Sequence, residues 1–175
     1  MTTIPPVETR VQILPEWTDL NGHMNVAWYV LAFDRATDTF YDALGIGWGY
    51  LEREQRSLFT LAMNVDYVRE VFAGHTVRVV SRLVDHDRKR LHYFHQMFHA
   101  ADGWLAATNE IVAIHVAMAT RRSTPFSDDT ATRLAAMQAA HSALPPAPQL
   151  GRKLGIERSE AKPRAIDDPE LPEGR

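Results

Sequence analysis

A group of polar and flexible residues lies directly before a long amphipathic segment of this 175-residue chain. The group comprises Asp19, Gly22, His23 and Asn25, and the amphipathic segment begins at Val26. A carboxylate can act as a general base or as a nucleophile, and the free N–H groups at the start of a helix can stabilise a developing negative charge. We therefore expect chemistry at this helix start, with Asp19 as the reacting group and the N–H groups near Asn25 and Val26 as the anion site.

The same residues also have structural uses, which the sequence alone leaves open. Asp19 can form a turn, and Asn25 can cap the helix that follows it. His23 can orient Asp19 or a substrate, or it can bond to the backbone of its own loop. Tyr29, one helical turn into the amphipathic segment, either reaches the substrate or packs in the core.

The segment from Val26 to Gly45 has the spacing of a helix. Its apolar positions recur every three or four residues, three aspartates share another face, and Gly45 supplies a stop. Trp28 and Leu31 widen the apolar stripe, so the helix over 26–44 is expected to be covered on more than one side. We predict that it is central to the fold.

Alternating or β-branched residues predict strands over 10–14, 59–67, 76–84, 91–100 and 104–118. Asp102-Gly103 is typical of a tight hairpin. Residues 45–50 are predicted as a loop, and Ser127 is expected to cap a short helix. One strand, one long helix and an antiparallel meander place the chain in the α+β class, with one sheet packed against the helix.

Composition limits the class of protein and the number of domains. We expect one domain over residues 1–144, followed by a tail over 145–175 that is rich in proline and charge. A net charge of −3 argues against nucleic acid as a partner. The chain has no cysteine, no signal-like start and no apolar run of membrane-spanning length, so we expect a cytoplasmic protein with no membrane partner. His92 should face away from His95 and His99 on its strand, and we predict no metal site.

The pattern Asp19-x-x-Gly22-His23-x-Asn25 followed by Tyr29 resembles the helix start of hotdog-fold acyl-CoA thioesterases of the 4-hydroxybenzoyl-CoA thioesterase type. The resemblance covers about residues 8–126. It implies a hotdog fold, an antiparallel sheet wrapped around one long central helix, in a homodimer or a dimer of dimers with active sites at the subunit interface. It also implies hydrolysis of a short acyl-CoA with no cofactor beyond the coenzyme A of the substrate.

The resemblance assigns roles to individual residues. Asp19, with His23 and Asn25, is the expected catalytic group, and the substrate is expected near Gly22, Val26 and Tyr29. Many members carry a second acidic residue two positions before the catalytic aspartate, where this chain has Trp17. Trp17 is therefore expected to alter the substrate pocket.

Basic residues occur in two predicted turns and offer contacts for the phosphates of coenzyme A. They are Arg88, Lys89 and Arg90 in one turn and Arg121 and Arg122 in the other. Arginine and lysine bind phosphate through charge-assisted hydrogen bonds. A solvated turn with no ligand is the alternative interpretation of both groups.

The stretch from Leu20 to Asp34 also resembles thioesterases of carnitine breakdown, for which betainyl-CoA is the implied substrate. Aromatic faces hold quaternary ammonium groups. Five aromatic residues lie near the expected site in the sequence, and they are Trp17, Trp28, Tyr29, Trp48 and Tyr50. We expect some of them to surround a cationic acyl group, and packing in the core or in a dimer interface is the alternative.

Two other functions fit the same residues. One is a hotdog enoyl-CoA hydratase, which pairs an aspartate with a histidine, although in that pattern the histidine stands one residue further on than His23. The other is an acyl-CoA binding module without catalysis, because a fold alone does not establish an activity. Release of a free thiol from an acyl-CoA distinguishes the thioesterase from both.

Overall fold

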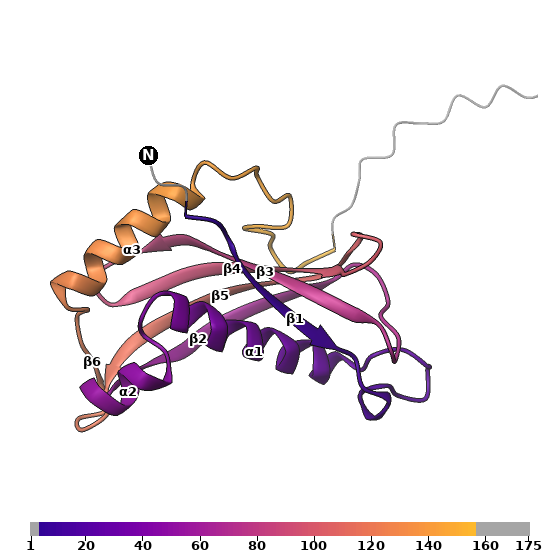
Figure 1. The fold of residues 1–175 in the computed structure, drawn as a ribbon, viewed down its shortest axis with the longest axis horizontal. Coiled ribbons are helices and arrows are strands. Elements are labelled where there is room, and N and C mark those ends of the chain that lie inside the picture. Colours follow the sequence, from indigo (N-terminus) through magenta and orange to yellow (C-terminus); the bar gives the residue numbers. More distant parts are fainter. Residues whose placement is uncertain (1–3, 157–175) are drawn as a thin grey trace, which may run out of the picture.

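The computed structural model describes residues 4–156, and Figure 1 shows one long helix lying across a single sheet. The strands are β1 (Val7–Gln12), β2 (Arg56–Tyr67), β3 (Thr76–His86), β4 (Arg90–His99), β5 (Leu105–Ala117) and β6 (Arg122–Ser123). The helices are α1 (Val26–Ala43), α2 (Trp48–Glu54) and α3 (Asp128–His141), with a 3-10 turn at Pro15–Trp17. The predicted α+β class, with an antiparallel sheet against one long helix, is confirmed.

The sheet order is β1-β3-β4-β5-β2, and β6 pairs with the end of β5. The predicted meander is therefore wrong for β2, which pairs with β5 rather than with the next strand in the chain. Arg56 lies opposite Ala117 and Tyr67 lies opposite Ala107. Alternation of apolar residues assigns each side chain to a face of the sheet but says nothing about which strand is the neighbour. In this order β2 becomes an edge strand.

Helix α1 forms where the sequence predicts it and ends one residue earlier. The Asn25 side chain accepts a hydrogen bond from the Ala27 N–H and caps the first turn. One stripe of the helix is buried, and it consists of Tyr29, Ala32, Phe33, Ala36, Thr37 and Phe40. Gly45 follows the last turn with a φ of +72°, which favours glycine. The helix is thereby fixed against the inner face of the sheet.

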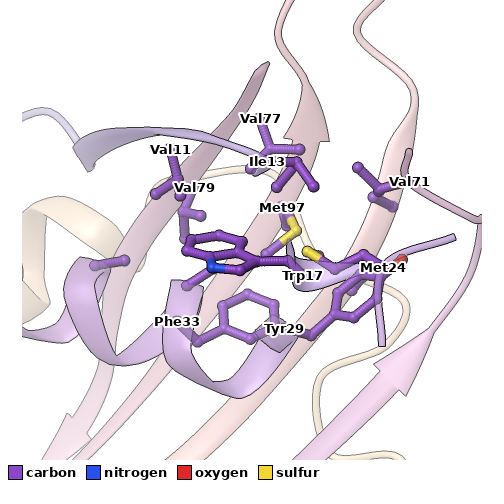
Figure 2. Packing of buried hydrophobic residues seen from close by; sticks show 14 residues of the cluster. Val11, Ile13, Trp17, Met24, Tyr29, Phe33, Val71, Val77, Val79 and Met97 are labelled. Carbon is purple, nitrogen blue, oxygen red and sulfur yellow. The ribbon is translucent and has the colours of Figure 1, made fainter. Parts of the chain in front are cut away.

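The buried stripe of α1 packs into two apolar clusters. Around the first half of the helix, Phe33 and Tyr29 contact apolar side chains from β1, β3 and β4, as Figure 2 shows. Around the second half, Phe40 packs with Tyr93 of β4 and with Leu134 of α3. The N-terminal half of the helix, where the polar loop lies, is therefore anchored in its own core cluster.

Helix α2 occupies the segment that the sequence predicts as a loop. Its N-cap residue, Gly47, approaches α1 so closely that a Cβ there would clash with the Asp42 carboxylate. Tyr50 is buried and its hydroxyl lies 2.9 Å from His115 Nε2. This helix has only seven residues, and glycine stands at positions 47 and 49. The sequence therefore shows no helical periodicity here. No helix within residues 4–156 is both long and apolar enough to cross a membrane.

The chain remains in contact with the sheet beyond α3. Arg82 Nη1 donates to the Pro145 carbonyl at 2.8 Å, and Ala147 is only 8% exposed. The Gly151 N–H donates to Glu110 Oε2 at 2.7 Å. These contacts extend past residue 144, where composition predicts the domain to end. Residues 157–175 of the predicted tail lie outside the described residues.

The free edge of β2 is unusually apolar for a protein surface. Phe59, Leu61 and Met63 are 38%, 56% and 46% exposed. Exposed apolar residues along an unpaired strand edge mark a surface that another chain can cover.

Candidate active site

Asp19 lies in a loop that folds back on itself before α1. The Asp19 N–H donates to the His23 carbonyl at 3.2 Å, and the Gly22 N–H donates to the Asp19 carbonyl at 2.9 Å. Thr18 and Met24 form an isolated antiparallel bridge that closes the loop. Gly22 has a φ of +84°, a conformation that other residues adopt only with strain. Gly22 thus serves the turn that presents Asp19.

Two donors hold the carboxylate of Asp19. The Asn21 N–H lies 2.8 Å from Oδ1, and Asn25 Nδ2 lies 3.1 Å from Oδ2. The bond from the Asn21 N–H, and after it the bond from Asn25, lowers the pKa of Asp19 below its ordinary value. The carboxylate is therefore ionised at neutral pH, and its orientation is fixed by the loop and the helix cap.

Of the first two N–H groups of α1, that of Ala27 is capped and that of Val26 is free. Asn25 Oδ1 accepts the Ala27 N–H at 3.0 Å. The Val26 N–H makes no hydrogen bond within residues 4–156, and Val26 is 58% exposed. A free N–H at a helix start carries the positive end of the helix dipole and suits an oxyanion. Asn25 fulfils its predicted capping role and also positions Asp19.

Within residues 4–156, His23 makes no hydrogen bond to the Asp19 carboxylate. Its Nδ1 lies 3.3 Å from the Met24 carbonyl oxygen, and its Nε2 lies 3.7 Å from Glu70 Oε1. Of the alternatives that the sequence leaves open, the structure favours contact with the loop backbone. His23 nevertheless contributes to the wall of the pocket beside α1.

A pocket of about 190 Å³ opens beside the start of α1. His23, Val26 and Tyr29 form one side, and Tyr67 and Glu70 form the other. The rings of Tyr29 and Tyr67 meet edge to face with centroids 5.2 Å apart. Burial raises the pKa of both phenols, so the rings stay neutral. Val26, whose N–H is free, belongs to the wall of this pocket.

The expectation that Trp17 alters the substrate pocket needs correction, because its side chain lies in the core. Trp17 is 2% exposed and stacks on Trp28 with ring centroids 5.2 Å apart. The Arg35 guanidinium lies 5.1 Å from the Trp17 ring. Figure 2 shows the indole among the apolar side chains of the first core cluster. The Trp17 side chain therefore extends the core and does not line the pocket beside α1.

Other predicted site residues lie at the far end of α1. Trp48 and Tyr50 belong to α2, which follows the end of α1. Arg121 lies in the turn between β5 and β6, and Arg122 is the first residue of β6. The Arg121 guanidinium lies 6.0 Å from the Phe59 ring at the start of β2. An 18-residue helix is about 27 Å long at ~1.5 Å per residue. Within one chain, these residues are therefore not brought together with Asp19.

The histidines of β4 serve separate structural roles. His92 Nε2 lies 2.7 Å from Glu110 Oε1, whereas His95 is fully buried between the hydroxyls of Thr37 and Ser81. The predicted difference in facing between His92 and His95 is confirmed. Within residues 4–156, no group of three His, Asp or Glu side chains converges on a common point.

Tyr67 and Glu70 are two of the pocket residues that the sequence does not reveal. Tyr67 is the last residue of a strand in which apolar and polar residues alternate. This alternation predicts that its side chain lies on the inner face of the sheet, and it predicts no contact with a substrate. Glu70 lies in an irregular segment with no local pattern. Their place opposite α1 depends on the pairing of β2 with β5, a long-range relationship. An exposed aromatic residue and an acid at the end of an edge strand are the only local signals.

Comparison with known proteins gives a consistent result. Residues 13–134 match the thioesterase-like superfamily. The betainyl-CoA thioesterase of Pseudomonas aeruginosa is 38% identical over 144 residues, which cover 82% of this chain and 91% of that protein. An L-carnitine dehydrogenase/betainyl-CoA thioesterase of Ruegeria pomeroyi is 31% identical over 140 residues, which cover 79% of this chain but 28% of that longer protein.

The fold also matches a solved structure. A hypothetical protein from Staphylococcus aureus in complex with CoA superposes with a TM-score of 0.80 at 28% identity, covering 90% of this chain and 100% of the other. The hotdog fold that the sequence resemblance implies is thereby confirmed. The polar loop, the start of α1 and the residues that line the pocket beside it all lie within residues 13–134, the region that matches the superfamily.

Proposed function

The chain belongs to the thioesterase-like superfamily and is an acyl-CoA thioesterase, and we propose betainyl-CoA as its substrate. The proposal rests on the named activity of its relatives, carried to a chain that covers 91% of the Pseudomonas aeruginosa enzyme. The products are coenzyme A and the free trimethylammonium acid. Hydrolysis of a thioester needs a base or nucleophile and an oxyanion site, and we expect no cofactor beyond the coenzyme A of the substrate.

The observation that carries the mechanism is the position of Asp19 at the start of α1. Its carboxylate bonds to Asn25, and the next residue, Val26, has a free N–H. A thioester carbonyl oxygen bound to that N–H presents its carbon toward the carboxylate. Asp19 then either takes a proton from an attacking water or attacks the carbon itself, forming an anhydride that water hydrolyses. In the general-base route Asp19 passes the proton that it took from water to the thiolate as the C–S bond breaks. In the nucleophilic route the thiolate leaves as the anhydride forms and takes its proton from solvent, and hydrolysis of the anhydride by water regenerates the Asp19 carboxylate.

The hydratase alternative is less favoured by this geometry. It requires a histidine that works together with the aspartate. His23 instead contacts the Met24 carbonyl and Glu70. Thioester hydrolysis needs only the carboxylate, the N–H and water.

We also propose that the protein is a homodimer joined along β2, alone or within a dimer of dimers. The exposed apolar residues of this edge strand are the support. A twofold axis makes the joined β2 strands antiparallel, so the N-terminal end of one lies beside the C-terminal end of the other. The turn with Arg121 and Arg122 then approaches Asp19 of the second subunit. In such a dimer these arginines serve as phosphate contacts for coenzyme A. We keep a cytoplasmic location as an expectation.

The test of the function is thiol release from betainyl-CoA in the presence of a thiol reagent. The wild type is expected to release coenzyme A, and Asp19→Asn is expected to lower kcat by about 10²–10⁴-fold with an unchanged melting temperature. Near wild-type turnover by Asp19→Asn would refute the catalytic role of Asp19. Loss of betainyl-CoA without thiol release would instead reveal an activity of another class.

The test of the dimer is the mass in solution by light scattering. Leu61→Lys places a charge on the exposed edge of β2, and we expect it to yield monomers with little activity. Ala136→Lys is the control, because Ala136 is an exposed residue of α3, away from β2. A wild-type monomer that is active at assay concentration contradicts the proposal.

A further inference from the structure

The pocket beside α1 has the position that the acyl group of the substrate requires. Val26 forms part of its wall, and the free Val26 N–H is the oxyanion donor. In betainyl-CoA a single methylene separates the thioester carbonyl from the quaternary nitrogen. A carbonyl oxygen on the Val26 N–H therefore places the ammonium group inside this pocket or at its mouth.

The walls of the pocket suit a cation without hydrogen-bond donors. Tyr29 is 4% exposed and fixed in the core, whereas Tyr67 is 49% exposed and keeps much of its ring surface free. Aromatic faces attract quaternary ammonium groups through the ring quadrupole. The methyl groups of a trimethylammonium offer nothing to a hydrogen-bond acceptor, so aromatic and anionic surfaces are the suitable partners.

The charges around the pocket are arranged to leave one acid facing it. Glu70 lines the pocket and its carboxylate lies 3.7 Å from His23 Nε2. The cation among the lining residues, Arg69, stacks its guanidinium over Trp104 at 4.4 Å from the ring centroid. Glu70 makes no ion pair with lysine or arginine within residues 4–156. Its negative charge is therefore free to act on a cationic ligand.

We propose that Tyr67 and Glu70 determine specificity by holding the quaternary ammonium of the acyl group, with Tyr29 as the fixed wall behind it. The inference rests on the proposed thioesterase function and adds the residues that select the substrate. Tyr67, Glu70 and Tyr29 thus replace the five aromatic residues that the sequence predicts around the cationic acyl group. Of those five, Tyr29 alone lines this pocket.

The experiment compares two acyl-CoA substrates of equal shape. Betainyl-CoA carries a trimethylammonium group, and 3,3-dimethylbutanoyl-CoA carries an uncharged tert-butyl group in its place. The wild type is expected to prefer betainyl-CoA in kcat/KM. Glu70→Gln should reduce that preference about 10-fold, because a single charge near the surface contributes about this much. Its kcat/KM for the uncharged substrate should stay within about twofold of the wild type.

The aromatic wall is tested with a conservative pair of variants. Tyr67→Phe keeps the ring and should keep the preference for the cation. Tyr67→Leu keeps an apolar wall without the quadrupole and should lower the preference about 5-fold. A loss of kcat/KM that is equal for both substrates in Tyr67→Leu or Glu70→Gln would show a structural role and overturn the proposal.

A control variant tests the other end of α1. Asp38 and Trp48 line a second pocket there, and Asp38→Asn removes an acid beside an aromatic residue. Asp38→Asn is expected to leave the cation preference unchanged. If it removes the preference while Glu70→Gln does not, the ammonium is bound elsewhere and the inference fails. If the wild type hydrolyses both substrates equally, the assignment of betainyl-CoA fails. If it hydrolyses neither, nor any other acyl-CoA, the thioesterase function itself fails.

Discussion

The side-chain amide of Asn25 connects the Asp19 carboxylate to the first turn of α1. Its Nδ2 donates to Asp19 Oδ2 at 3.1 Å, and its Oδ1 accepts the Ala27 N–H at 3.0 Å. The oxygen of the Asn25 amide thus pairs with one N–H of the first helical turn, while the nitrogen of the same planar amide orients the Asp19 carboxylate. The loop and the helix are thereby held in one geometry, which a shorter or charged side chain cannot reproduce.

The two roles of Asn25 are separable by substitution. Asn25→Ser keeps an oxygen that caps α1 but lacks the amide that reaches Asp19. We expect stability within about 0.5 kcal/mol of the wild type and a kcat about 10-fold lower, because one hydrogen bond to the carboxylate is lost. Asn25→Ala should lose the cap as well, at a cost of about 1 kcal/mol. Chemical unfolding and thiol-release kinetics measure both effects, and equal activity of Asn25→Ser and the wild type would remove Asn25 from the mechanism.

The pH dependence of the rate reports the ionisation of Asp19. Hydrogen bonds from the Asn21 N–H and from Asn25 lower the pKa of this carboxyl, so the group loses its charge only at a pH below the ordinary value of 3.8. The acid limb of kcat/KM should therefore lie below that value. In Asn25→Ser the limb should move to higher pH, since a donor to the charged form is gone. Short assays after a pH jump separate this effect from acid unfolding, and a limb that stays in place in the variant would contradict it.

The parts of the fold that depend on local pattern are predictable, and those that depend on distant pairing are not. The helix from Val26 and the strand over 59–67 follow from spacing alone. The pairing of β2 with β5 brings Tyr67 opposite α1, and no local signal encodes it. Nearness in sequence is also misleading around a long helix. Trp48 follows α1 closely along the chain but lies a helix length away from Asp19.

The buried imidazole of His95 should make stability depend on pH. Burial lowers the pKa of His95 from 6.5 to about 3, so the folded state stays unprotonated in a range where the unfolded chain binds a proton. The free energy of unfolding should therefore fall as the pH drops below 6.5, by about 1.4 kcal/mol per pH unit from this group. Burial also lowers the pKa of His115 and His141, which add to the slope.

The contribution of His95 is measured by difference. His95→Asn should lower stability near neutral pH, because Thr37 and Ser81 lose a partner in the core. Its slope between pH 6 and 5 should nevertheless be smaller than that of the wild type by about 1.4 kcal/mol per pH unit. Urea unfolding at several pH values gives both slopes. Parallel slopes would show that His95 does not titrate on unfolding in this range.

Truncation tests the segment after α3. Arg82 is 9% exposed, and its Nη1 donates to the Pro145 carbonyl. A chain that ends at Leu144 leaves this buried charge without that acceptor, and we expect the free energy of unfolding to fall by about 1–3 kcal/mol. A chain that ends at Ile156 keeps the contact and should lose less. Equal melting temperatures for the two truncated chains would show that the segment contributes nothing to stability.

A single proline can remove the oxyanion donor without disturbing α1. Val26 is the first residue of the helix, where proline is well tolerated because the N–H has no partner within the helix. Asn25 already has φ of −68° and ψ of 147°, which is the extended conformation that a following proline requires. Val26→Pro should therefore keep the melting temperature of the wild type, while kcat falls about 10²–10³-fold as expected for the loss of one oxyanion donor. Val26→Ala keeps the N–H and removes the same branched side chain, so it should remain active. If both variants lose the same activity, the side chain of Val26 matters and its N–H does not, and the oxyanion must be bound by another group.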